Sequence, residues 1–161
     1  MPVAAWLHAL EETWIGVVVR ESAFPYVEGT HVLALSLSVG AVVWVDLRLL
    51  GATMRARPVS EVFASVRTWM VAGFAVMFVT GAMLFAAHAT KAYESRIFRV
   101  KMAMLVLAGL NTLVFHLTID RRRAEWNEAA LPPAAARMAG LLSLVLWLSV
   151  IAAGRFFAYE L

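Results

Sequence analysis

The sequence has no cysteine in its 161 residues, and only 16% of its residues are charged. The absence of cysteine excludes a disulfide scaffold, thiolate zinc sites and iron–sulfur clusters. Soluble domains carry about 25% charged residues, so the shortage of charge argues against a soluble globular enzyme. The chain also lacks a hydrolase triad, a phosphate-binding loop and a dinucleotide fingerprint. We therefore look for a protein that works without these chemistries.

Hydrophobic residues make up 62% of the chain, and its mean hydropathy is +0.77. A membrane-spanning helix needs about 20 mostly apolar residues, and four segments meet this requirement: residues 31–50, 69–89, 100–119 and 138–157. Short connections between them favour antiparallel neighbours. The sequence therefore predicts an all-α integral membrane protein, a single membrane domain over residues 1–161, built as a four-transmembrane-helix up-down bundle.

Residues 2–20 are predicted to form an amphipathic helix that lies in the membrane interface. Apolar side chains recur there at helical spacing, at Trp6, Leu10, Trp14 and Val17. A signal peptide is the alternative, but the segment has no positively charged start, and Glu11 and Glu12 interrupt its apolar run. We therefore prefer the interfacial helix.

The second predicted helix has start signals well before its apolar part. Pro58 supplies a fixed backbone angle, Ser60 an N-cap hydroxyl, and Glu61 an early carboxylate. We expect this helix to protrude from the membrane by about two turns.

Basic residues set the predicted topology. Eight arginines fall on one side of the predicted spans: Arg48, Arg55, Arg57, Arg67, Arg121, Arg122, Arg123 and Arg137. Six basic residues fall on the other: Arg20, Lys91, Arg96, Arg99, Lys101 and Arg155. The positive-inside rule puts the first group in the cytoplasm and both termini on the outer side. The net charge of +3 is explained by topology, so we expect no nucleic-acid partner.

Four ionisable residues occupy the outer ends of the spans, one on each helix: His31, His88, Lys101 and Arg155. Two imidazoles and two cations suit haem b, with His31 and His88 as axial ligands and the cations near the propionates. The same two histidines are the candidate ligands of a metal ion, although no third ligand stands at useful spacing. The simpler alternative is that the histidines meet headgroups and the cations extend to the interface.

A second polar group occupies the inner ends of the spans: Asp46, Arg48, Asn111, His116 and Asp120. His116 and Asp120 are four residues apart, so they share a helix face and suit a proton relay. The alternative is a hydrogen-bonded helix end. Asp46 and Arg48 are expected to form a local ion pair, and Asn111 to make an interhelical hydrogen bond.

Several short motifs carry a resemblance to a known family. They include Arg20-Glu21-Ser22, Phe24-Pro25, Val45-Asp46-Leu47-Arg48-Leu49-Leu50-Gly51, Ala108-Gly109-Leu110-Asn111, Phe115-His116 and Gly154-Arg155. On these motifs the chain resembles, over nearly its whole length, an uncharacterised bacterial family of four-helix inner-membrane proteins, known only as a domain of unknown function. The resemblance implies four spans in the bacterial inner (cytoplasmic) membrane, with the predicted termini periplasmic, and implies no activity. The architecture is distantly similar to small membrane b-type cytochromes and copper-resistance membrane proteins.

Three functions remain open at this point. We expect a non-catalytic membrane subunit or scaffold, because four short spans leave little room for a substrate cavity. The alternatives are a haem b electron-transfer protein and a small carrier or proton-conducting module using Asp46, His116 and Asp120. An enzyme is not expected. The predicted partners are the lipid bilayer and either a second copy of the chain or another membrane-complex subunit.

Overall fold

The computed structural model describes residues 2–160, and these residues form helices and connections without any strand. The α-helices are α1 (Pro2–Glu11), α2 (Trp14–Val18), α3 (Phe24–Leu49), α4 (Val59–Ala87), α5 (Ala89–Glu94), α6 (Arg96–Val114) and α7 (Ala134–Phe157). Three further helical segments are the π-helical η1 (Val19–Ala23) and η2 (Phe115–Ile119) and the 3₁₀-helical η3 (Asp120–Glu125).

Four of the described helices are long and apolar enough to cross a membrane: Trp14–Leu49, Val59–Ala87, Arg96–Glu125 and Ala134–Phe157. This confirms the prediction of an all-α chain with four apolar helices. Each helix begins before its predicted apolar part, because helix geometry continues through polar residues that the hydropathy pattern leaves out. The first two end earlier than predicted, at Leu49 and Ala87. The second one begins at Val59, directly after Pro58, and so includes the expected extension.

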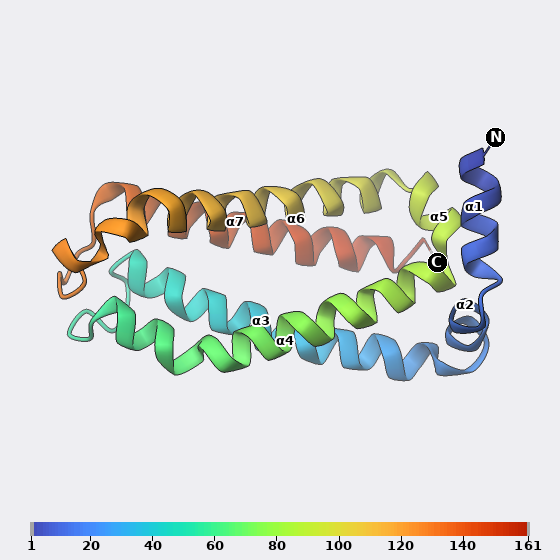
Figure 1. Ribbon diagram of the computed structural model, residues 1–161, viewed down its shortest axis with the longest axis horizontal. Coiled ribbons are helices and arrows are strands. Elements are labelled where there is room, and N and C mark those ends of the chain that lie inside the picture. Colours follow the sequence, from blue (N-terminus) through green and yellow to red (C-terminus); the bar gives the residue numbers. More distant parts are fainter. Residues whose placement is uncertain (1, 161) are drawn as a thin grey trace.

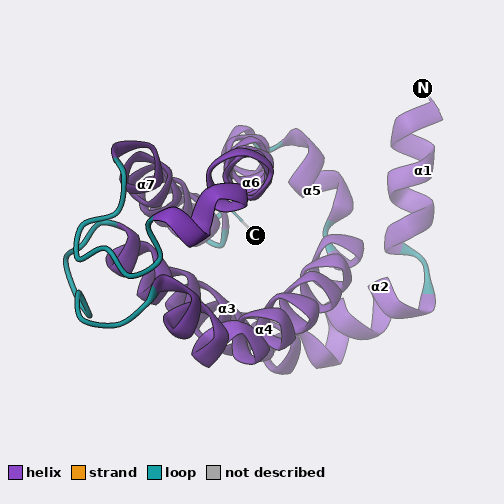
Figure 2. Ribbon diagram, turned by 60° about the vertical axis from the view of Figure 1, so that its left-hand side comes forward, coloured by secondary structure: helices purple, strands orange, loops and turns teal. Residues whose placement is uncertain are grey.

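The four long helices form an open bundle rather than a closed one. α3 packs along α4, α6 packs along α7, and α3 joins the two pairs by packing against α7. Within the described residues α4 and α6 do not pack along each other, although they are consecutive spans. Figure 2 shows the resulting arc, with α4 and α6 at its two ends. Successive spans run in alternating directions, as in an up-down bundle (Figure 1), but the pairing of α4 with α6 that a regular bundle would have is missing from the described residues.

The approach between α3 and α4 depends on Gly73. A Cβ atom at this position would lie 2.9 Å from the backbone nitrogen of Ser38 and 3.0 Å from the carbonyl oxygen of Ala34. Ser38 is fully buried at this crossing. Lipid tails are as apolar as leucine, so membrane helices associate through close packing of small residues rather than through apolar burial. Gly73 therefore sets the spacing of this helix pair.

The N-terminal segment lies across one end of the bundle, where α1, α2 and α5 form what we call the collar (Figure 1). The predicted continuous helix over residues 2–20 is wrong, because α1 ends at Glu11 and a new helix starts at Trp14. Thr13 is extended and its hydroxyl accepts a hydrogen bond from the Gly16 amide at 3.2 Å, which is a local N-cap. The interfacial position of this segment stays a prediction.

The opposite end of the bundle, which we call the loop end, holds the connections 50–58 and 126–133. Ser60 is not the N-cap of α4; Pro58 occupies that position without a side-chain cap bond. Instead, the amide oxygen of Asn127 accepts from the Ser60 backbone N–H at 2.9 Å, and the Asn127 amide nitrogen donates to the Ser60 hydroxyl at 3.0 Å. Trp126 is buried against Leu49. The helix start is therefore capped by a distant loop, which local sequence does not reveal.

Candidate functional site

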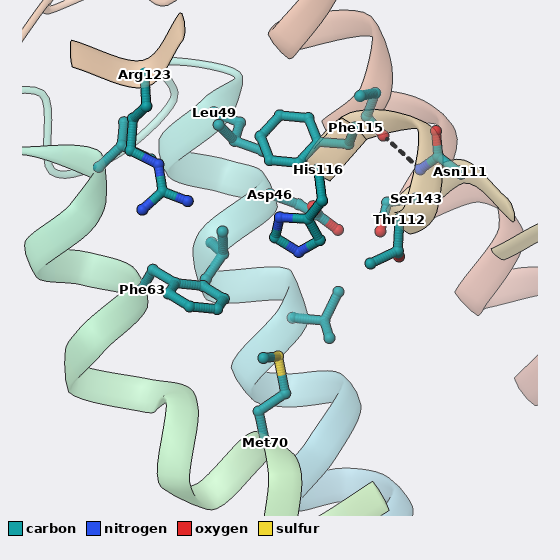
Figure 3. A pocket seen from close by; sticks show the side chains of 14 residues that line it. Asp46, Leu49, Phe63, Met70, Asn111, Thr112, Phe115, His116, Arg123 and Ser143 are labelled. Atoms are coloured by element: carbon teal, nitrogen blue, oxygen red, sulfur yellow. Dashed lines mark hydrogen bonds between the residues drawn. The ribbon is translucent and has the colours of Figure 1, made fainter. Parts of the chain in front are cut away.

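A cavity of about 90 Å³ lies near the loop end, between α3, α4, α7 and the C-terminal part of the third span. Most of its lining is apolar, and its polar lining residues are Asp46, Asn111, Thr112, His116, Arg123 and Ser143. Figure 3 shows these side chains around the cavity. A water molecule needs at least 10–15 Å³ of such space, so the cavity has room for several. Three of the predicted inner-end residues, Asp46, Asn111 and His116, thus line one space.

Asp46 is the most deeply placed acid of the cavity. It is 5% exposed, on the last turn of α3, and Ser143 of α7 interacts with its carboxyl group. Its Oδ2 atom is buried and has no hydrogen-bond partner among the described residues. A buried polar atom without a partner is costly, and an ionisable group at membrane depth is rare without a functional reason. Asp46 is therefore the strongest candidate functional residue.

The predicted ion pair between Asp46 and Arg48 does not form. Arg48 is fully buried, and its guanidinium group donates from Nε to the carbonyl of Arg57 at 2.8 Å and from Nη2 to the carbonyl of Ala129 at 2.9 Å. Side chains two residues apart on a helix point in different directions, so Arg48 reaches the loops while Asp46 reaches the cavity. Arg48 therefore holds the two connections of the loop end together.

His116 reaches the cavity from the π-helical turn η2. π-turns inside helices are rare and frequent at functional sites, because they change the direction of side chains. The Nδ1 atom of His116 lies 3.1 Å from Oδ2 of Asp120, which also pairs with Arg123. The imidazole meets the ring of Phe63 on α4 edge-on, with centroids 6.3 Å apart. The contact between His116 and Asp120 that their spacing suggests is thus present, and it lies beside the cavity.

An apolar layer separates the cavity from the collar. Its buried members are Val39, Ala108, Leu146, Trp147 and Val150. Val39 stands about midway between His31 and Asp46 on α3, and those two residues are about 22 Å apart along the helix axis. Asn111 lies on the cavity side of this layer, where its Nδ2 donates to the carbonyl of Ala139 at 3.0 Å and ties the third span to α7. The two polar groups therefore occupy separate compartments in this conformation.

His31 and His88, the predicted haem ligands, have different partners. His31 Nδ1 lies 2.9 Å from Thr80 Oγ1, whereas the His88 ring packs edge-on against Phe24 with centroids 5.4 Å apart. The His31 ring lies at the level of Thr80, which is eight residues before His88. The two imidazoles are therefore about 12 Å apart along the axis of α4. One iron needs both imidazoles at one level, and the close contact at Gly73 leaves no space for a porphyrin between α3 and α4. The arrangement does not fit a haem held by this pair.

The described side chains also do not gather as metal ligands. Within residues 2–160, no group of three or more His, Cys, Asp or Glu side chains could hold a metal ion. The four predicted outer residues also fail to gather in one place. Lys101 lies against Gly154 of α7, while Arg155 is exposed and donates from Nη2 to the Tyr159 hydroxyl at 3.1 Å.

His88 is expected to make the collar less stable in acid. It lies just beyond the end of α4, and burial lowers the pKa of its imidazole below 6.5, with Lys91 and Arg20 lowering it further and Glu11 opposing them. Because the folded collar disfavours the charged ring, its stability is complete above the unfolded pKa and decreases as the pH falls below it. We expect amides of α1 and α5 to exchange hydrogen faster at about pH 5.5 than at about pH 7.5 after correction for intrinsic exchange.

The matched comparison uses two histidines of the same collar. His88→Gln should remove most of the difference between the two pH values. His8→Gln should keep it, because His8 is exposed and has no comparable burial. An acid-induced loss of protection that persists in His88→Gln would show that another group is responsible.

These features define a class: an all-α chain with four candidate membrane spans and a small polar cavity near one end of an open bundle. The chain belongs to the family of unknown function DUF6644, whose model matches residues 5–160. This confirms the resemblance to an uncharacterised family and the four long apolar helices that it implies. No curated protein and no solved structure matches the chain.

Proposed function

We propose that the chain is a non-catalytic membrane subunit that takes up and releases protons at Asp46 in the loop-end cavity. The observation that carries this proposal is the buried carboxyl group of Asp46. Asp46 lines the cavity, and its Oδ2 atom has no hydrogen-bond partner among the described residues. A subunit that acted only as a packing scaffold would gain nothing from such a group. A proton bound to it removes the uncompensated buried charge.

The proton would enter from the loop end, which is the predicted cytoplasmic side. His116 and Asp120 lie there in contact, and the His116 side chain is 43% exposed. Histidine exchanges protons near neutral pH, and a positioned Asp–His pair is a common proton-transfer unit. The cavity has room for water between His116 and Asp46, and water can bridge polar groups that do not touch. Arg123 is the other charged side chain of the lining, where Asp120 neutralises it; α4 and α7 contribute no charged side chain.

The apolar layer around Trp147 limits proton access to one side, the loop end. It separates the cavity from His31 and Lys101, so the conformation described here offers no continuous polar path across the bundle. We therefore propose that proton binding at Asp46 controls a conformational change or acts on a partner subunit. It does not support steady proton conduction across the membrane. The haem alternative is not part of the proposal, because His31 and His88 do not meet.

Infrared difference spectroscopy of the protein in lipid nanodiscs tests the proposal. Titration of the wild-type protein should show a carbonyl band of a buried protonated carboxyl group that decreases as the pH rises. Asp46→Asn should lack this band. Glu128→Gln should keep it, because Glu128 is an exposed acid at the same end of the molecule. His116→Gln should keep the band but slow its response to a pH jump.

Two outcomes would contradict the proposal in different ways. If wild-type protein and Asp46→Asn give the same spectra at every pH, Asp46 does not exchange protons and the packing scaffold is the better description. If liposomes containing the protein show a steady proton flux that Asp46→Asn abolishes, the protein conducts, and the one-sided site is wrong.

A further inference from the structure

Asp120 divides its two carboxylate oxygens between two side chains of the third span. Its Oδ2 atom lies 3.1 Å from Nδ1 of His116, and its Oδ1 atom accepts a hydrogen bond from Nε of Arg123. The guanidinium group of Arg123 is permanently charged, and an ionised carboxylate only accepts hydrogen bonds. Asp120, paired with Arg123, therefore presents an acceptor to the imidazole of His116.

This contact favours one tautomer of His116. A neutral imidazole carries a hydrogen on one ring nitrogen and a lone pair on the other. A lone pair on Nδ1 would face the carboxylate oxygen of Asp120 and be repelled by it, whereas a hydrogen on Nδ1 is donated to that oxygen. The tautomer of a histidine is set in this way by the hydrogen bond that one of its nitrogens makes. Nε2 is then the ring nitrogen with the free lone pair.

Phe63 fixes the same group of side chains from α4. Its ring meets the imidazole of His116 nearly edge-on, with centroids 6.3 Å apart and planes at 70°. The guanidinium carbon of Arg123 lies 5.7 Å from the centroid of the same phenyl ring. Figure 3 shows Phe63 and Arg123 beside His116 at the cavity. Phe63 thus contacts both side chains that Asp120 binds, and it does so from a different helix.

The imidazole stands between the cavity and the loop end. His116 lines the cavity, Asp120 is not among the lining residues, and the His116 side chain is 43% exposed. The charged groups that face the ring are Asp120 and Arg123 from its own span and Asp46 from α3; α4 and α7 contribute no charged side chain to the lining. Since Nδ1 is bound to Asp120, Nε2 is the nitrogen available to water in the cavity.

We propose that Asp120, Arg123 and Phe63 are positioning residues that keep His116 in the Nδ1–H tautomer, so that Nε2 is the atom at which protons enter the cavity. A proton from water adds to the Nε2 lone pair and forms an imidazolium ion. The new N–H bond then breaks, its proton passes to a water molecule of the cavity, and the lone pair is restored. Nδ1 keeps its hydrogen throughout. The role in proton entry rests on the proposed function of Asp46, whereas the tautomer does not.

Nitrogen-15 NMR of the histidine rings tests the tautomer directly, with the full chain in lipid nanodiscs at about pH 8.5, where histidine is neutral. We expect a protonated Nδ1 and an unprotonated Nε2 for His116, whose signals are identified by their loss in His116→Gln. Asp120→Ala should give a mixture of the two tautomers. Glu125→Ala is the matched control and should leave the tautomer unchanged, because Glu125 is an exposed acid of the same segment.

Two pairs of variants test Phe63 and Arg123. Phe63→Leu should slow the infrared response of Asp46 to a pH jump about tenfold or more, because a misplaced proton-transfer group loses much of its rate. Phe78→Leu, an exposed position of the same helix, should change it less than twofold. Arg123→Gln should weaken the tautomer preference, because Asp120 loses the partner of its other oxygen. Arg122→Gln, at an exposed arginine, should preserve it.

The outcomes separate this inference from the proposed function. If the Asp46 band is absent from the wild-type protein, proton exchange at Asp46 is wrong, and the NMR spectra still decide the tautomer. If the band is present but Nδ1 of His116 is unprotonated, proton entry at Nε2 is wrong. Equal effects in a variant and its control would overturn the positioning role of that residue. The tautomer is read in the wild-type protein, so this arm stands even if a variant fails to fold.

Discussion

Gly73→Ala is expected to destabilise the protein strongly, although it adds a single methyl group. The new Cβ would lie 2.9 Å from the backbone nitrogen of Ser38, and a backbone atom cannot move aside as a flexible side chain can. The α3–α4 pair would have to separate along its length. Overpacking of a tight contact costs about 1–3 kcal/mol, and a backbone contact belongs at the upper end of that range. Unfolding by sodium dodecyl sulfate in mixed micelles measures the free energy of unfolding.

Gly40→Ala and Gly109→Ala supply the matched controls. Both glycines lie in long helices, and a Cβ atom at either position would meet nothing within 4 Å. Alanine is a better helix former than glycine by about 1 kcal/mol, so these variants should be unchanged or more stable. The free energy of unfolding should therefore fall in Gly73→Ala and stay the same or rise in the two controls. A stabilised Gly73→Ala would show that α3 and α4 do not approach as described.

Arg48→Met is the second substitution with a large expected effect. The guanidinium group is fully buried and donates to the carbonyls of Arg57 and Ala129, one in each connection at the loop end. Hydrogen bonds from charged groups contribute about 1.5–3 kcal/mol each. Methionine fills the space but leaves both carbonyls without a donor. We expect the free energy of unfolding to fall by about 3 kcal/mol, and trypsin to cut the connection 50–58 faster than in the wild-type protein.

Arg121→Met is the control for the loss of one positive charge at the same end. Arg121 is exposed and has no recorded side-chain contact, so its stability and cleavage pattern should stay close to those of the wild-type protein. Equal losses in the two variants would assign the effect to net charge. Arg48→Lys should lie between Arg48→Met and the wild-type protein, because an ammonium group cannot reach two diverging carbonyls with the fork of a guanidinium.

Asp46 and Lys101 are ionisable groups toward opposite ends of the bundle. The Oδ2 atom of Asp46 is buried without a hydrogen-bond partner among the described residues, and no carboxylate of these residues lies within ion-pair distance of Lys101. The apolar layer around Trp147 stands between them. A spectroscopic change at one site that also appears at the other would show that this layer rearranges.

Much of the architecture could be predicted from local pattern. Apolar runs of about 20 residues require a helix in lipid, because only internal hydrogen bonds satisfy the backbone there. The start of α4 after Pro58 follows from the local start signal that proline supplies. The contact between His116 and Asp120 follows from their four-residue spacing. The partners of Arg48 and the cap formed by Asn127 could not be predicted, since each joins segments distant in the sequence.

The sequence by itself determined an all-α chain with four helices able to cross a membrane, because length and hydropathy are properties of single segments. Only the tertiary structure decided which helices pack, leaving α4 and α6 apart, and which polar residues share a space. It placed Asp46 and His116 on one cavity, and it gave His31 and His88 different partners. The reason is that helix packing depends on small groups such as Gly73 at particular crossings, and side-chain direction at a helix end depends on local turns such as η2.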